Sequence, residues 1–409
     1  MTATSRESHN APWLFGILVL PYGFTTAVTV LLMPYLLRKY GMPVDRIAEI
    51  GAIAILPAIW SFLWSPLADA GLRRSTWIVI AAVTASAASA VAVLDVHGGQ
   101  AMLTALLFLA NALTGLLSSA CGALLTAMPE NLRGHASGWY QAGNVGGGAL
   151  AGGSVIWLAD HASLGVVAGA VAAAMVLPSL AALLVAEPPP VRRAMGPLLA
   201  GMAHDLGDLL RSRRTWLGLA FFLSPVGTAA VSNLISSVGP DYRASGNEVA
   251  LITGVVSGLL SSLACFLGGI VADRMSRMAA YALAGVLTAI FAGWMALGPL
   301  SAFTYGAGYA GYSIATGFGY AVYTALLLEV LGKREHAAAF AYSVLNASGN
   351  VSISYMTWLD GVGYKHGGAR GLMGMDAAAN GIFAVILLVV AAFAGRIISG
   401  GESPRSRPV

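Results

Sequence analysis

Two short stretches of the sequence each place a carboxylate at the end of an apolar run and arginines just after it. The two carboxylates, Asp69 and Asp273, are 204 positions apart. A carboxylate at a membrane helix end that faces arginines can hold neighbouring helices together in one conformation and release them in another. We therefore predict a gate at these turns, with a plain topological cap as the alternative. The gate residues are Asp69, Arg73, Arg74, Asp273, Arg274 and Arg277.

A second set of polar residues lies on one face of the apolar segment 301–328. At about 100° per residue, its six members fall within an arc of about 80°. Each tyrosine offers a ring surface and a hydroxyl group, so this face is suited to a large amphipathic solute. The alternative is an interfacial belt plus helix packing, because tyrosine is enriched at membrane surfaces. The residues predicted to line a cavity are Tyr305, Tyr309, Tyr312, Thr316, Tyr320 and Tyr323.

Polar residues in other apolar segments are candidates for the same cavity. Tyr22 and Thr26 lie in the first segment, Asn233 in the seventh and Asn346 in the eleventh. Hydrogen bonding between helices is the alternative for each of them. Further polar residues open to both interpretations are Thr25, Thr29, Asn111, Thr114, Gln141, Asn144, Ser224, Ser236, Ser237, Tyr342, Asn350, Ser352 and Tyr355.

The acidic residues are all expected in loops or at helix ends. A charge at the bilayer centre costs about 2.5–3.5 kcal/mol on insertion scales, so a deep carboxylate usually marks function. Glu49 and Glu329 lie nearest to the membrane interior. They are the candidate proton carriers, with a structural role beside a loop as the alternative. No arginine or lysine is expected in mid-membrane, which disfavours an anionic substrate.

The elements that must position these residues are membrane helices. The chain has 409 residues, of which 57% are hydrophobic and 10% charged, whereas a soluble domain has about 25% charged residues. A helix needs about 20 apolar residues to cross a bilayer. This rule predicts an all-α membrane protein with twelve crossings. They are 12–37, 46–68, 75–95, 101–127, 136–159, 164–186, 215–238, 247–272, 278–299, 301–328, 337–359 and 378–396.

The basic residues indicate the orientation. With both termini in the cytoplasm, sixteen lysines and arginines fall in cytoplasmic segments and six fall outside, in agreement with the positive-inside rule. The net charge of +4 therefore reflects topology rather than nucleic-acid binding. The first apolar run is longer than the roughly 7–15 residues of a signal-peptide core, so we interpret it as a retained helix.

The two halves of the sequence resemble each other. Residues 123–125 and 325–327 share Ala-Leu-Leu, and a basic residue and a histidine recur at 133–136 and 334–337. The predicted domains are a six-helix bundle at 1–186, a cytoplasmic linker at 187–214 and a second six-helix bundle with a tail at 215–409. Apolar residues recur at helical spacing in 195–210, which predicts a surface amphipathic helix in the linker.

Residues 65–74 resemble the cytoplasmic loop motif of the major facilitator superfamily, Gly-x-Leu-Ala-Asp-Arg-x-Gly-Arg-Lys. Leu67, Ala68, Asp69 and Arg73 match it, whereas Ser65 departs from it. The second copy keeps Gly269, Ala272, Asp273, Arg274 and Arg277. Two bundles of six helices related by duplication are the layout of these transporters.

Two further stretches resemble one cluster within that superfamily. Residues 62–69, Phe-Leu-Trp-Ser-Pro-Leu-Ala-Asp, and 20–23, Leu-Pro-Tyr-Gly, are similar to runs in the AmpG-like muropeptide permeases. That cluster also includes acetyl-CoA transporters and the RhtX/FptX siderophore importers. Its fourth helix usually carries Gln-Asp-x-x-x-Asp, and residues 118–123 here contain no carboxylate.

The resemblance implies a secondary active transporter that moves a small or medium amphipathic solute across a bacterial inner membrane by alternating access, with proton coupling left open. A non-transporting assembly factor of the same superfamily and a drug-type efflux pump are the alternatives. We expect a monomer in the lipid bilayer with a small-molecule substrate and no nucleic-acid partner. No grouping typical of an enzyme, metal or cofactor site is present in the sequence.

Overall fold

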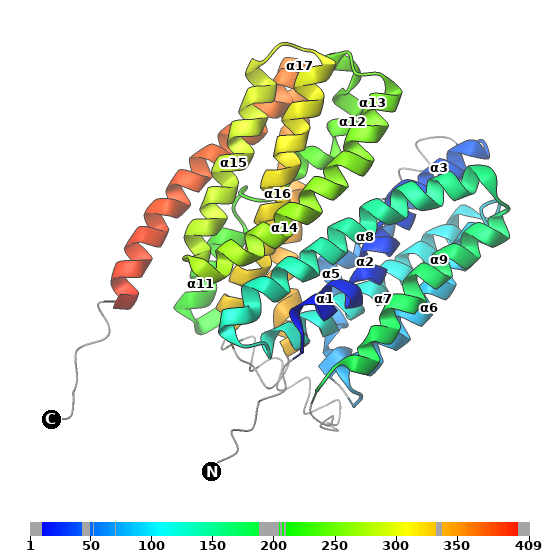
Figure 1. The fold of residues 1–409 in the computed structure, drawn as a ribbon, viewed down its shortest axis with the longest axis horizontal. Coiled ribbons are helices and arrows are strands. Elements are labelled where there is room, and N and C mark those ends of the chain that lie inside the picture. The colour runs from blue at the N-terminus through cyan, green and yellow to red at the C-terminus, as the bar shows by residue number, and fades with distance from the viewer. Residues whose placement is uncertain are drawn as a thin grey trace.

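The computed structural model of the chain describes residues 10–42, 50–51, 53–69, 71–187, 204, 207, 210–332 and 338–399. Within these ranges every regular element is a helix. Figure 1 shows two groups of helices, α1 to α9 on one side and α11 to α17 on the other. The first helix begins and the last one ends at the same face of the molecule, as an even number of crossings requires.

The first group contains six crossings. The first crossing consists of α1 (Pro12–Leu18), α2 (Leu20–Ala27), a π-helical turn (Val28–Leu32) and α3 (Met33–Lys39). The second has α5 (Pro57–Trp60) and two 3₁₀ turns (Ser61–Leu63 and Ser65–Asp69) in its described part. The other four are α6 (Arg74–Leu94), α7 (Gln100–Thr126), α8 (Arg133–His161), and α9 (Leu164–Ser179) with a 3₁₀ extension (Leu180–Leu184). A 3₁₀ turn, Glu130–Leu132, precedes α8.

The second group contains the other six crossings. The seventh is α11 (Arg213–Phe222), a 3₁₀ turn (Ala230–Asn233) and α12 (Ile235–Val238); a 3₁₀ turn (Pro240–Tyr242) follows. The eighth is α13 (Gly246–Ala250), a π-helical segment (Leu251–Val256) and α14 (Ser257–Arg274). The ninth and tenth are α15 (Arg277–Leu297) and α16 (Ala302–Leu331). The label α17 (Ala338–Ser399) covers the eleventh and twelfth, because Gly367 and Gly368 interrupt it with non-helical backbone angles.

The twelve-helix architecture predicted from the sequence is confirmed. Eight of the described helical stretches are long and apolar enough on their own to cross a membrane, and the stretch at 339–391 contains two crossings. The last two helices differ from the predicted ranges 337–359 and 378–396, since they meet in a tight turn at Gly367 and Gly368. The predicted linker helix and most of the segment 187–214 lie outside the described residues.

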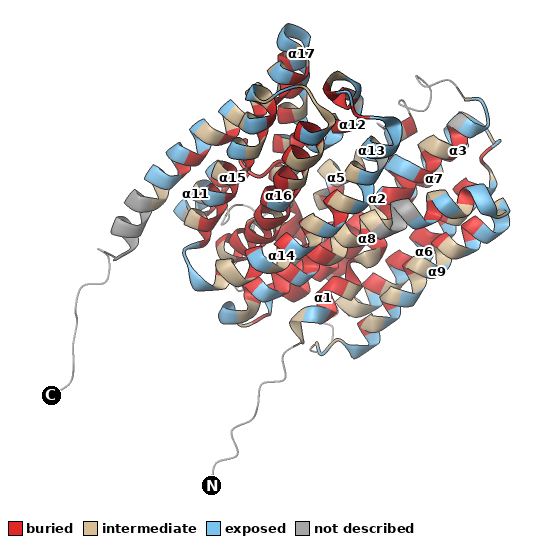
Figure 2. Ribbon diagram, turned by 45° about the horizontal axis from the view of Figure 1, so that its top comes forward, coloured by how far each residue is buried: buried red, intermediate tan, exposed pale blue. Residues whose placement is uncertain are grey.

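Small residues bring the two groups together. An added Cβ on Gly138 of α8 would lie 2.9 Å from the carbonyl oxygen of Cys265 in α14, and one on Gly269 would lie 3.0 Å from the Gly138 Cα. Backbones approach this closely only where side chains are small, which is a common way to pack membrane helices. Figure 2 shows that α16 is buried along most of its length. The tyrosine-bearing helix is therefore central to the second bundle.

Candidate functional site

A cavity of about 410 Å³ lies between the two bundles. Its size falls within the range of roughly 300–1,000 Å³ that is typical of small-molecule sites. Both bundles contribute to its wall. The lining residues are Tyr22, Gly23, Thr26, Ser118, Tyr140, Gln141, Asn144, Val145 and Gly148 from the first bundle, and Phe222, Val226, Gly227, Thr228, Tyr281, Tyr320, Tyr323, Tyr342, Asn346, Gly349, Asn350, Ser352 and Ile353 from the second.

A break in the seventh crossing forms part of the cavity wall. Residues 223–229 are not helical, and Gly227 and Ala229 have φ angles of +72° and +53°. Gly227 packs against Tyr281, because an added Cβ would lie 3.1 Å from the tyrosine ring. Irregular backbone is tolerated at membrane depth where it lines a cavity. The predicted continuous helix at 215–238 is therefore wrong in its middle, and Pro225 and Gly227 were the sequence signal for this break.

The cavity wall combines a larger apolar part with hydroxyl and amide groups, and it contains no Asp, Glu, Lys, Arg or His among its lining residues. Several of its polar groups bond to each other: the Gln141 amide donates to Thr324 Oγ1 at 2.6 Å, and the Asn144 amide donates to Gln141 Oε1 at 3.1 Å. The Ser118 and Tyr140 hydroxyls lie 2.7 Å apart. Tyrosine rings and side-chain amides together suit a neutral solute that carries both apolar surface and hydrogen-bonding groups.

The structure divides the predicted substrate-binding residues into two sets. Five of them line the cavity: Tyr22, Thr26, Tyr320, Tyr323 and Asn346. The other five lie outside its lining: Asn233, Tyr305, Tyr309, Tyr312 and Thr316. The tyrosine face of α16 therefore reaches the cavity only in the C-terminal half of the helix.

The residues outside the lining make contacts within the second bundle. The Tyr305 hydroxyl donates to the carbonyl oxygen of Ile235 at 3.2 Å, and Thr316 donates to the carbonyl oxygen of Ser313. The Asn233 amide donates to Thr357 Oγ1 at 3.0 Å. The bonds of Tyr305 and Asn233 are of the interhelical kind that the sequence left open as the alternative, whereas the bond of Thr316 stays within α16.

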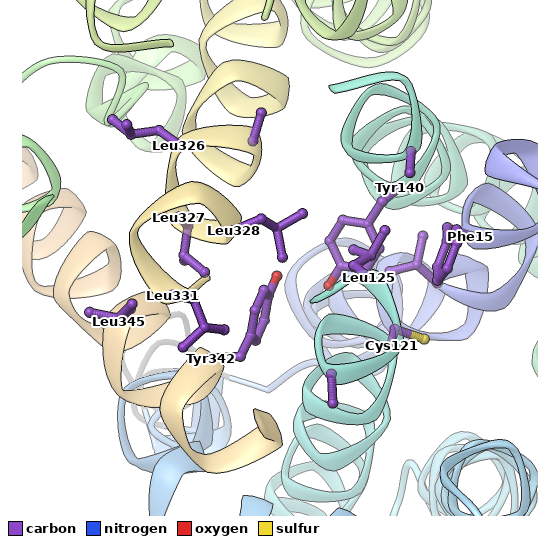
Figure 3. Packing of buried hydrophobic residues seen from close by; sticks show 14 of the residues in the cluster. Phe15, Cys121, Leu125, Tyr140, Leu326, Leu327, Leu328, Leu331, Tyr342 and Leu345 are labelled. Carbon is purple, nitrogen blue, oxygen red and sulfur yellow. The ribbon is translucent and has the colours of Figure 1, made fainter. Parts of the chain in front are cut away.

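An apolar layer closes one end of the cavity. Tyr342 packs directly on Gly122 of α7, because an added Cβ on that glycine would lie 2.4–2.6 Å from ring atoms of Tyr342. Figure 3 shows Tyr342 and Leu328 of the second bundle facing Leu125 and Tyr140 of the first. All four belong to one buried cluster that spans both bundles.

Asp69 joins the two bundles at the same end of the molecule as this apolar layer. Its Oδ1 accepts a hydrogen bond from Arg74 at 2.8 Å within the first bundle. Its Oδ2 accepts from the backbone N–H of Ala339, in the first turn of the eleventh helix, at 2.9 Å. A carboxylate at a helix N-terminus interacts favourably with the free N–H groups and the helix dipole. Asp69 of one bundle therefore caps a helix of the other.

Asp273 makes the corresponding contact in the opposite direction. Its carboxylate accepts from the backbone N–H groups of Gly134 at 2.7 Å and His135 at 2.9 Å, in the first turn of α8. The His135 ring also contacts it. Arg277 lies 3.8 Å from Asp273, and it also donates to the carbonyl oxygen of Glu130 in the first bundle at 3.0 Å. The two turns thus form reciprocal contacts between the bundles.

The remaining gate and proton candidates occupy different positions. Arg73 and Arg274 are exposed. Glu329 is half-buried and forms an ion pair with Arg277 at 3.3 Å. Glu49 lies outside the described residues.

The expectation that every acidic residue lies in a loop or at a helix end is wrong for two aspartates. Asp360 and Asp376 are fully buried inside the eleventh and twelfth helices. The sequence placed both in a loop because glycines and charged residues surround them. Tyr140 and Tyr281 also line the cavity and were not predicted; Tyr140 lies one helical turn before the candidate Asn144, which was the available signal, whereas Tyr281 stands in an apolar stretch.

Comparisons with known proteins agree with this architecture. A model described as Major Facilitator Superfamily matches residues 14–357. Among solved structures, the E. coli fucose:proton symporter FucP is similar with a TM-score of 0.67 at 15% identity over 91% of this chain and 97% of that chain. The human organic anion transporter MFSD10 gives 0.71 at 17% identity, over 92% and 98% of the two chains.

A third similar structure is the proton:xylose symporter XylE bound to 6-bromo-6-deoxy-D-glucose. It gives a TM-score of 0.66 at 14% identity, over 93% of this chain and 94% of that chain. No curated protein matches the chain. At these identities the solved structures show a shared fold.

Proposed function

We propose that this chain, which belongs to the Major Facilitator Superfamily, is a secondary active transporter for a neutral amphipathic solute. The single observation that carries the proposal is the cavity of about 410 Å³ whose wall is built by both bundles and whose one end is closed. Alternating access places the binding site between two halves that rock against each other. A cavity in that position is the arrangement this mechanism needs.

The contacts of Asp69 and Asp273 support a gating role for both turns. Each carboxylate accepts hydrogen bonds from backbone N–H groups of the opposite bundle. Separating the bundles at this end breaks these bonds, whereas the residues that line the cavity are different ones and do not take part in them. We therefore assign Asp69, Arg74, Asp273 and Arg277 to a clasp that stabilises one of the two conformations.

The chemistry of the cavity wall supports the class of solute. It offers six tyrosines and four side-chain amides and no charged residue, so it favours a neutral molecule with ring-stacking and hydrogen-bonding groups over an ion. Two of the structurally similar proteins are symporters of the sugars fucose and xylose, and sugars are neutral solutes of this kind. The AmpG-like kinship rests on the motifs at 20–23 and 62–69, and it adds muropeptides and siderophores to the solutes that need testing.

The remaining assignments follow the sequence. The excess of basic residues in alternate loops supports a membrane protein with both termini in the cytoplasm, and the AmpG-like resemblance supports the bacterial inner membrane. In that orientation the clasp closes the cytoplasmic end of the cavity. We assign the domains as 1–186, 187–214 and 215–409 and propose that the transporter acts as a monomer.

The test has two stages. The purified protein is first screened by thermal shift against neutral sugars, muropeptides, siderophores and lipophilic cations, and uptake of each stabilising compound is then measured in reconstituted vesicles. We expect a neutral compound to raise the melting temperature and to accumulate in vesicles. Binding without uptake of any compound would favour the non-transporting assembly factor. Stabilisation by lipophilic cations alone would favour the drug-type efflux pump.

A further inference from the structure

Two aspartates lie inside the second bundle, away from the cavity wall. Asp360 and Asp376 occupy the two arms of the last helical hairpin and are close enough for their charges to interact. The arms touch at Gly363 and Gly371, where an added Cβ on Gly363 would lie 2.6 Å from the Gly371 carbonyl oxygen. This backbone contact is within about two helical turns of both carboxyl groups. It holds the two arms together beside them.

The carboxyl groups have more acceptor atoms than donors around them. Among the described residues, both side-chain oxygens of Asp360, Oδ2 of Asp376 and Oδ1 of Asn380 are buried without a hydrogen-bond partner. The three side chains are fully buried. The Tyr312 hydroxyl donates to Asp376 Oδ1 at 3.4 Å. Buried polar atoms in proteins almost always have partners, so four orphaned acceptors on these three side chains indicate that a donor is missing.

In the part of the chain that the structure describes, the elements packed around the pair supply no positive charge. From α16 come Tyr312 and its neighbour Tyr309. From α15, the ninth crossing, Ala289 faces Gly381 and Gly293 faces Ala377. No ion pair joins either aspartate to a lysine, arginine or histidine among the described residues.

The charged and titratable groups nearest in sequence lie at the turn of the hairpin, where the side chains of Lys365, His366 and Arg370 are exposed. Arg370 is exposed and donates to the carbonyl oxygen of Gly298. Tyr364 is hydrogen-bonded to Asp241. Thr357, one turn before Asp360, accepts from Asn233. An ionised carboxylate in such a place is costly unless it is paired. One proton shared by the two carboxyl groups removes one of their two charges and supplies a hydrogen-bond donor.

Two helix faces connect this site to the cavity. At about 100° per residue, Asp360 lies within about 40° of Tyr342, Asn346 and Ile353, which line the cavity wall. Asp360 is two turns, or about 10 Å, beyond Ile353. On α16, Tyr312 lies within about 20° of the cavity residue Tyr323. A change at the carboxyl pair can therefore move the same two helices that hold the solute.

We propose that Asp360 and Asp376 together form a buried proton-binding site, and that this site couples proton movement to transport; the second half of this statement rests on the proposed function. A proton from water forms an O–H bond on one carboxylate oxygen, and that hydroxyl donates to a neighbouring orphaned acceptor. Its release returns the proton to water and leaves two carboxylates that repel each other. That repulsion favours the conformation in which water enters the bundle. The candidate Glu329 is instead paired with Arg277.

The proton site is tested first on the purified protein without any solute. Infrared spectroscopy detects the carbonyl stretch of a protonated carboxyl group. We expect this band in the wild-type protein at neutral pH and its loss in the double variant Asp360→Asn, Asp376→Asn. Asparagine has nearly the shape of a protonated aspartic acid, so the variant is expected to fold. Asp160→Asn is the matched control, because Asp160 is exposed and pairs with Lys39 at 2.9 Å.

Thermal stability gives a second readout of the same site. The unfolded chain exposes its carboxyl groups to water, where they are ionised at neutral pH, whereas the folded site holds a proton. The folded protein therefore binds more protons, and its stability falls as pH rises. We expect a steeper fall in melting temperature between about pH 6 and about pH 8 for the wild type than for the double variant. No band in the wild type, a band that persists in the double variant, or stabilisation by sodium ions at constant pH would each overturn the proton site.

Coupling is tested in vesicles with a solute found by the screen. We expect an inward pH gradient to drive accumulation by the wild type, and the Asp376→Asn variant to lose this dependence while it still exchanges solute downhill. A wild type whose uptake ignores the pH gradient, or an Asp376→Asn variant that keeps the dependence, would overturn the coupling. If no solute moves at all, the proposed function fails, and the infrared result still decides the proton site.

Discussion

Replacing Gly122 by alanine is expected to shift the protein away from the conformation described above. The new Cβ would lie 2.4 Å, 2.5 Å and 2.6 Å from Cδ1, Cγ and Cδ2 of the Tyr342 ring. Carbon atoms in good contact are about 3.5–4.0 Å apart, so the ring must retreat by about 1 Å. These atoms are at the base of the ring, and the helix that carries Tyr342 must move with them.

The cost falls on one conformation only. Gly122 and Tyr342 belong to different bundles, and they separate when the bundles part at this end. Overpacking of this kind costs about 1–3 kcal/mol. A difference of that size between two states changes their equilibrium by about 5–150-fold. Gly115→Ala on the same helix is the matched control, since its added Cβ would meet Ser61 at 3.5 Å, an ordinary contact.

The measurement is the distance between two spin labels across the closed end. Cysteines replace the exposed residues Ala127 of the first bundle and Met275 of the second, in a background in which the buried Cys121 and Cys265 are alanine. We expect the distance distribution of Gly122→Ala to shift towards longer values and that of Gly115→Ala to match the parent. Identical distributions for both variants would refute the role of the Tyr342 contact as a closure.

Three further predictions concern the clasp, the cavity wall and Glu329. Asp69→Asn removes the charge that Arg74 and the Ala339 N–H contact. We therefore expect uptake to slow by about tenfold, equivalent to about 1.4 kcal/mol, while the solute affinity measured by calorimetry stays unchanged. Lost binding in a folded variant would contradict this. Tyr320→Phe is expected to weaken solute binding by roughly 2–12-fold, the contribution of one hydrogen bond. Tyr305→Phe is expected to lower the melting temperature and to leave the solute affinity unchanged. Equal effects of the two variants on affinity would contradict the division of the tyrosine face. Glu329→Gln is expected to keep the pH dependence of uptake after a pH jump in vesicles, because Glu329 already pairs with Arg277. Loss of the pH dependence in this variant would assign the coupling role to Glu329.

The sequence by itself determined the number of crossings. A bilayer requires about 20 apolar residues per helix and leaves the backbone no partner outside the helix, so length and composition were sufficient. The same constraint identified the turns at Asp69 and Asp273, because charged residues in a membrane protein gather where helices leave the membrane.

The sequence was also sufficient to find the tyrosine face of α16, but it did not show which of these residues line the cavity and which contact another helix. Periodicity reports which residues share a face, and all six residues do. Whether a given part of that face meets a cavity or another helix depends on the neighbours. Tyr320 and Tyr323 reach the space between the bundles, whereas Tyr305 reaches the carbonyl oxygen of Ile235.

Only the tertiary structure decided where the deepest charges lie. Glycines on both sides of the last turn made residues 360–377 read as a loop, but Gly363 and Gly371 are the points at which two helices touch. Glycine breaks a helix in water and permits close packing in a membrane, and the sequence cannot distinguish these two uses without the partner helix. The sequence also did not indicate that Asp69 and Asp273 each cap a helix of the opposite bundle. Asp69 and the Ala339 N–H that donates to it are separated by 270 residues. Contacts of that separation are set by how the bundles pack.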